Sequence, residues 1–428
     1  MKIIAYEGPA GTGKTTRLIQ SLESLLNSEP LRDCQRALAL TFMHGSRRRL
    51  HDRLSKLSVL RGRFHCSTFD SFAFMVCKRW KSLLNRIGLS LPGDGEFDRT
   101  CDCCGALLEQ ALARSWVTTG FPLVVVDEAQ DLTQERLRIV CALSAQSNLL
   151  VAADEFQCLD DRLIPNPTVE WLKAATIPES LSAIHRTNEA GLLRAAFAIR
   201  NGEDVPIKSK AFKVYPTPKD ILAATFCANA IAWGGTGNVA IITPSRKGGF
   251  TEAIIRLVSQ RQLGKGNGPY PCHWESTDAD DINATMHKLA LTDKVSHSGL
   301  VSCVGSLKGA FPAGLISEWA DKQRSVCGQT DFLRQDVERQ INRQFSLRRH
   351  FSHSNRNRFP VMTVHQAKNR EFDGVIVIWP HTVGGDAQQK RRLLYNAVTR
   401  AKSWCLVLVQ NKKALDAPPF KASSDPNK

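Results

Sequence analysis

The sequence predicts an α/β protein with parallel sheets covered by helices. Three observations support this fold class. Residues 2–6 form a short apolar strand that runs through a glycine-rich loop into an amphipathic helix. Farther along, apolar β-branched segments alternate with helical patterns, as parallel strands joined by crossover helices do. Several of these segments end in polar or acidic residues, which is typical of strands with a site at the carboxyl edge of their sheet.

The glycine-rich loop has the spacing of a phosphate-binding site. It reads Gly8-Pro9-Ala10-Gly11-Thr12-Gly13-Lys14-Thr15 and lies between a strand and a helix. Glycines leave the backbone N–H groups free to surround a phosphate, and the next helix presents its N-terminus to the same anion. Lys14 can reach the terminal phosphates, and the hydroxyl of Thr15 can bind Mg²⁺. A glycine turn that binds nothing is the alternative, but the spacing and the flanking elements favour a nucleotide site.

The apolar segment 123–126 supplies the second half of such a site. Asp127 and Glu128 follow it directly. Asp127 is expected to hold Mg²⁺ through water, and Glu128 is expected to polarise the water that attacks the phosphate. Solvated acids at the end of a strand are the alternative, which the upstream loop disfavours.

Composition points to a basic protein with a polyanionic partner. The 428 residues allow two or three domains, and the 43% of hydrophobic residues suffice for their cores. The net charge of +16 favours nucleic acid as the partner, with an anionic membrane as the alternative. No apolar run is long enough to span a bilayer and no signal peptide is evident, so the chain is expected in the cytoplasm without a membrane partner.

The 13 cysteines are expected to be reduced thiols, as is usual in the cytoplasm. Cys101, Cys103 and Cys104 form the one cluster. A zinc site would need a fourth ligand, and no matching pair of cysteines or histidines is evident. We therefore expect plain thiols there, with zinc as the alternative.

The rest of the chain divides at changes of pattern. Strands are expected at 36–42, 148–153, 238–244, 360–365, 374–378 and 404–409, and helices at about 188–201 and 387–402. Residues 80–115 and 246–358 read as irregular insertions, the second of them basic. We expect a first domain at 1–200 with a small insertion at about 80–115, a connection at 201–237, a second domain at 238–411 with a basic helical insertion at about 246–358, and a disordered tail at 412–428.

Two segments of the first domain carry candidates for contact with nucleic acid. The strand at 36–42 runs into Arg47-Arg48-Arg49, and Phe69 and Phe72 lie among hydroxyls. Arginines can pair with phosphates, and aromatic rings can stack on bases. A solvated helix face for the arginines and a place in the core for the aromatic rings are the alternatives.

Eight segments, taken in order, resemble the motifs of superfamily 1 DNA helicases of the UvrD, Rep and PcrA type. They are GPAGTGKTT (motif I), LTFMHGSRRRL (Ia), STFDSFA (Ic), VVVDEAQDLT (II), AADEFQ (III), IHRTNEA (IV), VMTVHQAKNREFDGVIV (V) and RRLLYNAVTRAK (VI). Apart from motif I, each segment alone is weakly specific. Their order and their span over most of both predicted sheets make the resemblance specific.

The resemblance implies two RecA-like P-loop NTPase domains with reduced insertions and with ATP and Mg²⁺ between them. Gln157 would sense the γ-phosphate, and arginines from across the cleft would stabilise the charge that develops during hydrolysis. The implied catalytic residues are Lys14, Asp127, Glu128, Gln157, Arg186 and Arg400. The implied nucleotide-binding residues are Gly11, Thr12, Gly13, Lys14, Thr15, Thr16, His185 and Glu371, with Thr15 and Asp127 at the metal. Single-stranded DNA would contact Thr41, Phe42, Phe69, Phe72, Thr363 and His365.

The sequence departs from the family pattern at several positions. His185 stands where a tyrosine usually stacks on adenine, and Cys158-Leu159-Asp160 follow Gln157 where stacking aromatics are usual. The glutamine motif that reads adenine is expected to be absent, since Met1 begins on the first strand. These departures predict an intact ATPase with reduced base-stacking and strand-separating parts.

Three functions follow from this interpretation. The first is an ATP-dependent helicase or translocase that moves 3′ to 5′ on single-stranded DNA. The second is an ATP-gated, DNA-binding regulatory subunit of a nuclease-containing complex, such as an anti-phage system, without unwinding of its own. The third is an RNA helicase, because nothing in the sequence reads the 2′-hydroxyl. Steady-state ATPase and unwinding assays distinguish the first two.

Overall fold

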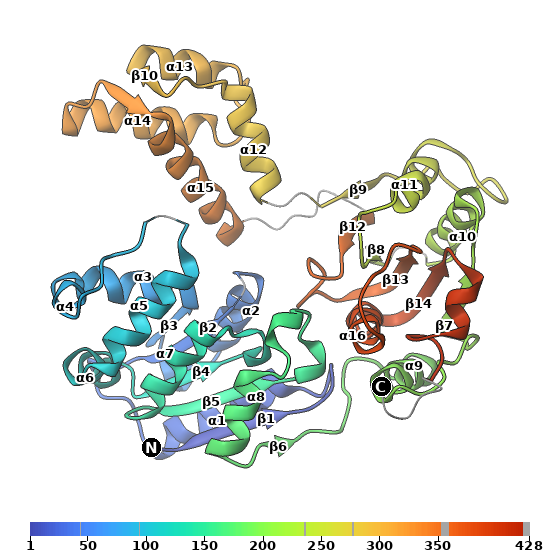
Figure 1. Ribbon diagram of the computed structural model, residues 1–428, viewed down its shortest axis with the longest axis horizontal. Coiled ribbons are helices and arrows are strands. Elements are labelled where there is room, and N and C mark those ends of the chain that lie inside the picture. The colour runs from blue at the N-terminus through green and yellow to red at the C-terminus, as the bar shows by residue number, and fades with distance from the viewer. Residues whose placement is uncertain (43, 94, 235–236, 276–277, 352–358, 423–428) are drawn as a thin grey trace. The chain divides into compact units, whose positions relative to one another are not determined.

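A computed structural model describes residues 1–42, 44–93, 95–234, 237–275, 278–351 and 359–422. The chain forms two compact units, one from the described parts of 1–273 and 357–428 and the other from those of 274–356. The first unit contains two six-stranded sheets with helices packed on them (Figure 1). The α/β fold with parallel sheets is therefore confirmed.

The first sheet carries the amino-terminal half of the chain. Its strand order is β3-β2-β4-β5-β1-β6, and all of its pairs are parallel. The strands are β1 Ile3–Glu7, β2 Ala37–Thr41, β3 Phe64–Thr68, β4 Leu123–Val126, β5 Asn148–Ala153 and β6 Glu179–Ser180. Parallel pairing aligns the carboxyl ends of β1, β4 and β5 along one edge, where the predicted phosphate loop and acids lie.

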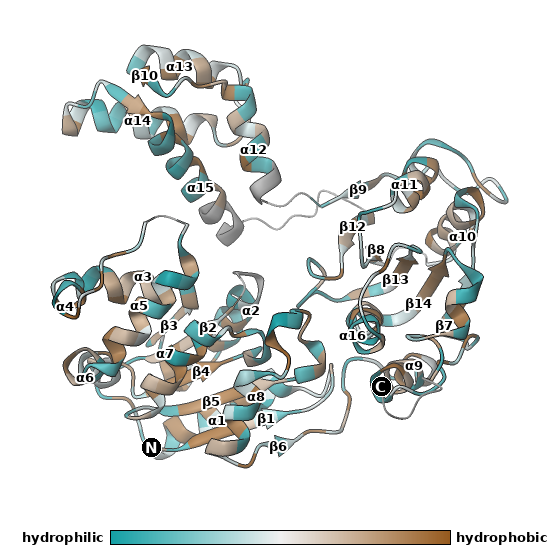
Figure 2. Cartoon of the chain, viewed as in Figure 1, coloured by the Kyte–Doolittle hydropathy of each residue, from teal (hydrophilic) through white to brown (hydrophobic). Residues whose placement is uncertain are grey.

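Helices cover both faces of this sheet. Figure 2 shows β4 and β5 in the hydrophobic colours, as expected for strands buried on two sides. The helices are α1 Lys14–Ser28, α2 His44–Leu54, α3 Phe69–Arg79, α4 Lys81–Arg86, α5 Phe97–Glu109, α6 Ala111–Gly120, α7 Gln134–Ser144 and α8 Pro167–Ala175. Short 3-10 turns lie at Ser58–Leu60, Ala129–Asp131, Glu155–Gln157 and Asp161–Leu163.

Helices α4, α5 and the start of α6 occupy most of residues 80–115, so the expectation of an irregular segment was wrong for most of this range. Helix α5 packs between α3 and α7 and buries its cysteines and leucines in the first core. Its periodic apolar residues are Cys101, Cys104, Leu107 and Leu108. In the sequence, the nearby Pro92-Gly93 and the unusual cysteines obscure this helical spacing.

The second sheet has the order β7-β14-β13-β8-β12-β9. The pairs from β7 to β12 are parallel. Its strands are β7 Phe212–Pro216, β8 Val239–Thr243, β9 Cys272–Trp274, β12 Phe359–Thr363, β13 Phe372–Trp379 and β14 Ala401–Val409. Its helices are α9 Ala190–Asn201, α10 Asp220–Trp233, α11 Phe250–Gln260 and α16 Ala387–Val398.

Several boundaries differ from those expected. Residues 201–237 contain the edge strand β7 and the helix α10, not only a connection. Helix α9, expected in the first domain, packs on α16 and buries Leu192, Ala195 and Ile199 in the second core. Apolar residues lie on all sides of α10, so the sequence shows no helical period there.

Residues 246–273 also belong with the second sheet, and the separate compact unit begins at 274. That unit is an α-helical bundle with an antiparallel pair of short strands, β10 and β11. Its elements are α12 Asp278–Leu289, β10 Lys294–Ser296, α13 His297–Gly305, α14 Ala313–Cys327, β11 Asp331–Leu333 and α15 Arg334–Phe351. Phe332, Ile316, Ile341 and Leu300 are fully buried in its core.

The expected disordered tail is ordered through residue 422, and residues 423–428 lie outside the described part of the chain. Phe420 is 3% exposed and packs against Trp379 with ring centroids 5.8 Å apart. Its carbonyl accepts a hydrogen bond from the Val205 N–H. One apolar side chain among prolines and lysines thus fixes this segment to the second core.

We expect Phe420→Ala to lower the free energy of unfolding by about 3–5 kcal/mol, because it leaves a cavity in that core. Denaturant titration followed by circular dichroism measures this loss. Phe97→Ala is the matched control, since Phe97 is 58% exposed at the start of α5. Equal effects of the two substitutions would mean that the tail does not anchor the second core.

Within the described residues, no helix is both long and apolar enough to cross a membrane.

Candidate nucleotide site

The glycine-rich loop joins β1 to α1 at the carboxyl edge of the first sheet. Gly11 and Gly13 have φ values of +83° and +79°, which L side chains rarely adopt. A Cβ on Gly11 would also lie 2.8 Å from the Cβ of Arg186. Helix α1 begins at Lys14 with no side-chain cap at Gly13, so its first backbone N–H groups face the loop without a capping side chain. The loop has the backbone that binding a phosphate requires.

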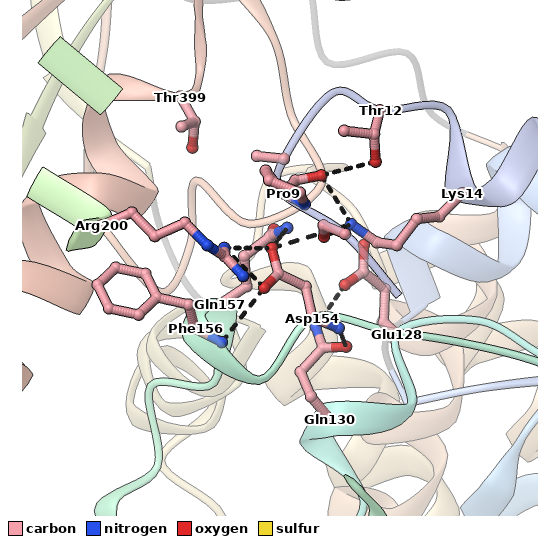
Figure 3. A network of polar contacts seen from close by, with 12 residues as sticks. Pro9, Thr12, Lys14, Glu128, Gln130, Asp154, Phe156, Gln157, Arg200 and Thr399 are labelled. Carbon is pink, nitrogen blue, oxygen red and sulfur yellow. Dashed lines mark hydrogen bonds and ion pairs between the residues drawn. The ribbon is translucent and has the colours of Figure 1, made fainter. Parts of the chain in front are cut away.

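Lys14 lies across this loop, as the sequence predicts for a phosphate-binding lysine. Its ammonium donates to the carbonyl oxygens of Gly8 at 2.8 Å and Pro9 at 3.0 Å (Figure 3). Asp154 lies 3.9 Å from the same nitrogen. Burial lowers the pKa of Lys14, while the nearby acids act in the opposite direction. The side chain is thus held close to the place where the phosphates would lie.

Thr15 and Asp127 lie together, as a shared metal site requires. The Thr15 hydroxyl donates to Asp127 Oδ2 at 2.8 Å, although the two residues are 112 positions apart. Burial, and then the charge of Glu128, raise the pKa of Asp127 to about 6. A carboxylate and a hydroxyl at this separation are a suitable pair of oxygen ligands for Mg²⁺.

Glu128 is held in an unusual backbone conformation directly after β4. Its φ is +56°, in the left-handed region that non-glycine residues seldom occupy. Gln130 Nε2 donates to its carboxylate at 2.6 Å. Burial acts to raise the pKa of Glu128, but Lys14 and the Gln130 hydrogen bond outweigh it, so the pKa is lowered. The carboxylate is therefore ionised and oriented at neutral pH.

Asp154 is a central residue of the site that the sequence analysis quoted but did not select. It follows β5, is 2% exposed and accepts from Gln157 Nε2 at 2.7 Å and from Arg200 at 2.9 Å (Figure 3). Its backbone N–H donates to Gln130 Oε1 at 2.9 Å. Asp154 therefore joins the lysine of the loop, the glutamine of motif III and an arginine from α9.

Gln157 and Arg400 meet although they come from different sheets. Arg400 donates to Gln157 Oε1 at 3.3 Å and to the Asn396 carbonyl at 3.0 Å. Arg400 was expected on a helix at about 387–402. Helix α16 instead ends at Val398, so Arg400 lies in the turn before β14. Burial, and then the charge of Arg186, lower the pKa of Arg400 to about 10, which leaves it charged at neutral pH.

Arg186 also bridges to the second sheet. Its Nε donates to Glu371 Oε1 at 2.9 Å, and a second nitrogen donates to the Thr399 carbonyl at 2.8 Å. Lys402 pairs with the other oxygen of Glu371 at 3.3 Å. Glu371, expected at a ribose, thus contacts two cations, and its carboxylate also positions Arg186.

The remaining nucleotide-site candidates surround the same loop. The Thr12 hydroxyl donates to the Pro9 carbonyl at 2.9 Å, and the His185 N–H donates to the Gly11 carbonyl at 2.8 Å. The Thr16 hydroxyl accepts from Arg53 at 3.4 Å. The His185 ring is exposed near Gly13, where it can lie against a base.

Two further contacts join the halves of the site and were not expected from the sequence. Lys368 donates to both oxygens of Asp131 at 2.7 and 2.9 Å. The Ala10 N–H of the phosphate loop donates to the Tyr395 hydroxyl at 2.8 Å. Tyr395 lies within the sequence quoted as motif VI, so the motif itself was the available signal.

The candidates for DNA contact divide into buried and accessible side chains. Phe69 and Phe72 are 1% and 0% exposed in the first core, so the expectation that they stack on bases is contradicted. Thr41 is fully buried in β2 and cannot present its hydroxyl to a phosphate. Phe42 is 36% exposed, with the Arg136 guanidinium 5.3 Å above its ring.

Thr363 is the last residue of β12 and His365 follows it, at the carboxyl edge of the second sheet. Thr363 is partly buried and its hydroxyl donates to Gln366 Oε1 at 3.2 Å, whereas His365 is exposed. These two residues and Phe42 remain the accessible candidates for DNA contact.

The cysteine cluster lies on the buried face of α5. Burial raises the pKa of Cys101, Cys103 and Cys104, which leaves all three as neutral thiols. In the part of the chain that the structure describes, no group of three or more metal-ligating side chains occurs. The cluster contributes to the packing of α5 on α3 and α7.

Two family models match the segments of the chain that carry this site. Residues 1–161 match an AAA domain, and residues 359–408 match a UvrD-like helicase C-terminal domain. The second half of the site therefore matches the UvrD-like helicases. This class consists of ATP-hydrolysing enzymes, and the two matches cover the loop, both acids and the turn with Arg400.

Among solved structures, the chain is similar to nonstructural protein 10, the helicase of an arterivirus. Against its complex with DNA the identity is 12% and the TM-score 0.40, over 97% of this chain and 62% of that one. Against a second structure of that helicase the identity is 13% and the TM-score 0.39, over 95% and 59%. The chain thus spans less than two thirds of the length of that helicase. No curated protein sequence matches it.

Proposed function

We propose that the chain is a UvrD-like helicase that hydrolyses ATP to move 3′ to 5′ along single-stranded DNA. The observation that carries the proposal is the set of contacts between the two halves of the site. Arg400 reaches Gln157, and Arg186, which follows the first sheet in sequence, is held by Glu371 and Thr399 of the second domain. Such contacts make the catalytic arrangement depend on the position of the second domain relative to the loop.

Each residue of the site has a chemical task in this proposal. Lys14 and the loop N–H groups bind and orient the phosphates, and Glu128 orients the attacking water and takes up its proton. Arg186 and Arg400 stabilise the charge that develops on the phosphoryl group. When bound, Mg²⁺ neutralises phosphate charge, and Thr15 and Asp127 are the residues that would hold it.

The path of DNA in this proposal crosses the carboxyl edges of both sheets. Phe42 follows β2 at one edge, and Thr363 ends β12 at the other, with His365 two residues farther on. The net charge of +16 supports a polyanionic partner. We place the protein in the cytoplasm, where its 13 cysteines would stay reduced.

A second candidate function is that of an ATP-gated regulatory subunit, for example with a nuclease partner. The burial of Phe69 and Phe72 favours it, because these rings cannot stack on bases. Gln157 is also followed by the buried Cys158 and not by an accessible aromatic ring. Fewer stacking side chains would weaken the grip that strand separation needs.

Steady-state ATPase rates with and without single-stranded DNA test the proposal, alongside unwinding of a duplex with a 3′ tail. DNA-stimulated hydrolysis with unwinding of the 3′-tailed but not the 5′-tailed duplex is expected for the helicase. Stimulated hydrolysis without unwinding would favour the regulatory subunit. Stimulation by RNA alone would contradict both DNA functions.

Arg200 gives a further prediction, since it contacts the buried Asp154 but would not touch the nucleotide. We expect Arg200→Gln to lower kcat about tenfold with little change in KM, because Asp154 then lacks a cation to help it hold Gln157. Arg200→Lys should recover part of the rate, since it restores the charge. Unchanged kcat in Arg200→Gln, or a rise in KM alone, would remove Arg200 from the positioning network.

A further inference from the structure

A cavity of about 300 Å³ lies on the second domain between α10, β7 and β14. None of the residues that line it belongs to the nucleotide site or to the candidate DNA contacts described above. The cavity is lined by four aromatic residues and two lysines among others: Tyr215, Phe226, Trp233, Trp404, Lys210 and Lys213. Among the residues that the structure describes, none that lines it carries a carboxylate.

The aromatic side chains of this cavity are held in place by the fold. Tyr215 stacks on Phe226 with ring centroids 4.7 Å apart and planes 24° from parallel. Trp404 lies directly over the backbone of Gly374, where a Cβ would come within 2.2 Å of the indole ring. A glycine at position 374 is therefore required for this position of the indole. Trp233, at the end of α10, is 77% exposed.

The lysines give the cavity a positive rim. Lys210 and Lys213 are exposed, and Lys208 is bridged to Lys213 by an antiparallel backbone pair. Among the described residues, none of the three forms an ion pair with an acidic side chain. An exposed indole beside uncompensated ammonium groups matches the chemistry of a nucleotide strand, which carries both flat bases and negative phosphates.

We propose that this cavity is a second binding site for single-stranded nucleic acid. Bases would stack on Trp233 and Trp404, and phosphates would pair with Lys210 and Lys213. A protein partner is the competing occupant, but lysine is depleted from protein interfaces whereas lysine interleaved with aromatic rings is typical of single-strand sites. Such a site gives the second domain a hold on the strand that does not use Thr363 or His365.

The test measures binding of a fluorescein-labelled oligothymidylate to the full chain by anisotropy, without nucleotide, at fixed salt. We expect Trp233→Ala and the double variant Lys210→Glu/Lys213→Glu each to weaken binding about tenfold. Both change exposed side chains, so the fold is expected to persist. The matched controls are Phe97→Ala, at an exposed aromatic residue, and Lys78→Glu/Lys81→Glu, at exposed lysines of the first domain.

Intrinsic tryptophan fluorescence provides a second readout. Oligothymidylate should quench it in the wild-type chain and quench it less in Trp233→Ala. Unchanged affinity in both cavity variants, with weaker binding by His365→Ala, would overturn this site while leaving the proposed function intact. If the wild-type chain bound no oligonucleotide, both would fail. Loss of binding to an acidic, tyrosine-containing peptide in the cavity variants, with DNA binding unaffected, would assign the cavity to a protein partner.

Discussion

Lys14→Ala should reduce ATP turnover to the background of the assay. The ammonium of Lys14 lies over the loop that joins β1 to α1, where it donates to the Gly8 and Pro9 carbonyl oxygens. Removing it takes away the charge that the β- and γ-phosphates would meet and leaves Asp154 and Glu128 with less positive charge nearby. Phosphate release measured with and without single-stranded DNA should show the loss under both conditions.

Two further variants separate charge from folding in this experiment. Lys14→Met keeps most of the length of the side chain without its charge, and it should be as inactive as Lys14→Ala. Lys173→Ala, at an exposed lysine of α8, should retain wild-type turnover. Thermal melting of each variant shows whether the fold is kept. Turnover in a folded Lys14→Ala protein would contradict the assignment of the loop to nucleotide binding.

Much of the fold could be predicted because parallel strands have a strong local signature. The segments that became β2, β4, β5, β8 and β13 are continuous apolar runs, as expected for strands buried on both faces. The loop with Lys14 and the acids after β4 carry their chemistry in adjacent residues. A sequence displays such features directly, so the acids, the loop and their sheet were found together.

The predictions that proved wrong concerned side chains whose burial no local sequence pattern shows. Phe69 and Phe72 lie beside hydroxyls in the sequence, but the turn of α3 directs both rings into the first core. Phe420 stands among prolines and lysines, yet it fills a gap beside Trp379. In each case tertiary packing determined the outcome, and composition alone favoured the wrong alternative.

The set of site residues predicted from the sequence was incomplete for a related reason. Asp154 and Tyr395 lie within quoted motifs, but Asp154 pairs with Arg200, 46 positions away, and Tyr395 with Ala10, 385 positions away. Arg200 belongs to no motif and reaches Asp154 only because α9 packs on the second sheet. Long-range contacts of this kind arise from the topology, so they become visible only once the two sheets are placed.

Arg400→Ala should leave nucleotide binding nearly intact and slow hydrolysis by about 10³-fold or more. The guanidinium of Arg400 is 2% exposed and contacts Gln157, so it lies next to the residue expected to sense the γ-phosphate. Arg400 stabilises mainly the charge that develops during the reaction. Its loss should therefore lower kcat without raising the dissociation constant of the nucleotide. Fluorescent-nucleotide titration and single-turnover hydrolysis measure the two quantities separately.

Arg400→Lys provides the sharper comparison, because it keeps a positive charge but not the planar group that reaches Gln157 and Asn396 together. It should recover only a small part of the rate. Arg391→Ala, at a neighbouring arginine that contacts the Gly202 carbonyl, should hydrolyse ATP at the wild-type rate. If affinity and turnover fell in parallel in Arg400→Ala, the arginine would act by holding the two sheets together. If only turnover fell, the charge of Arg400 would act on the reacting phosphate. The contact of Arg400 with Gln157 would then make hydrolysis depend on the position of the second domain.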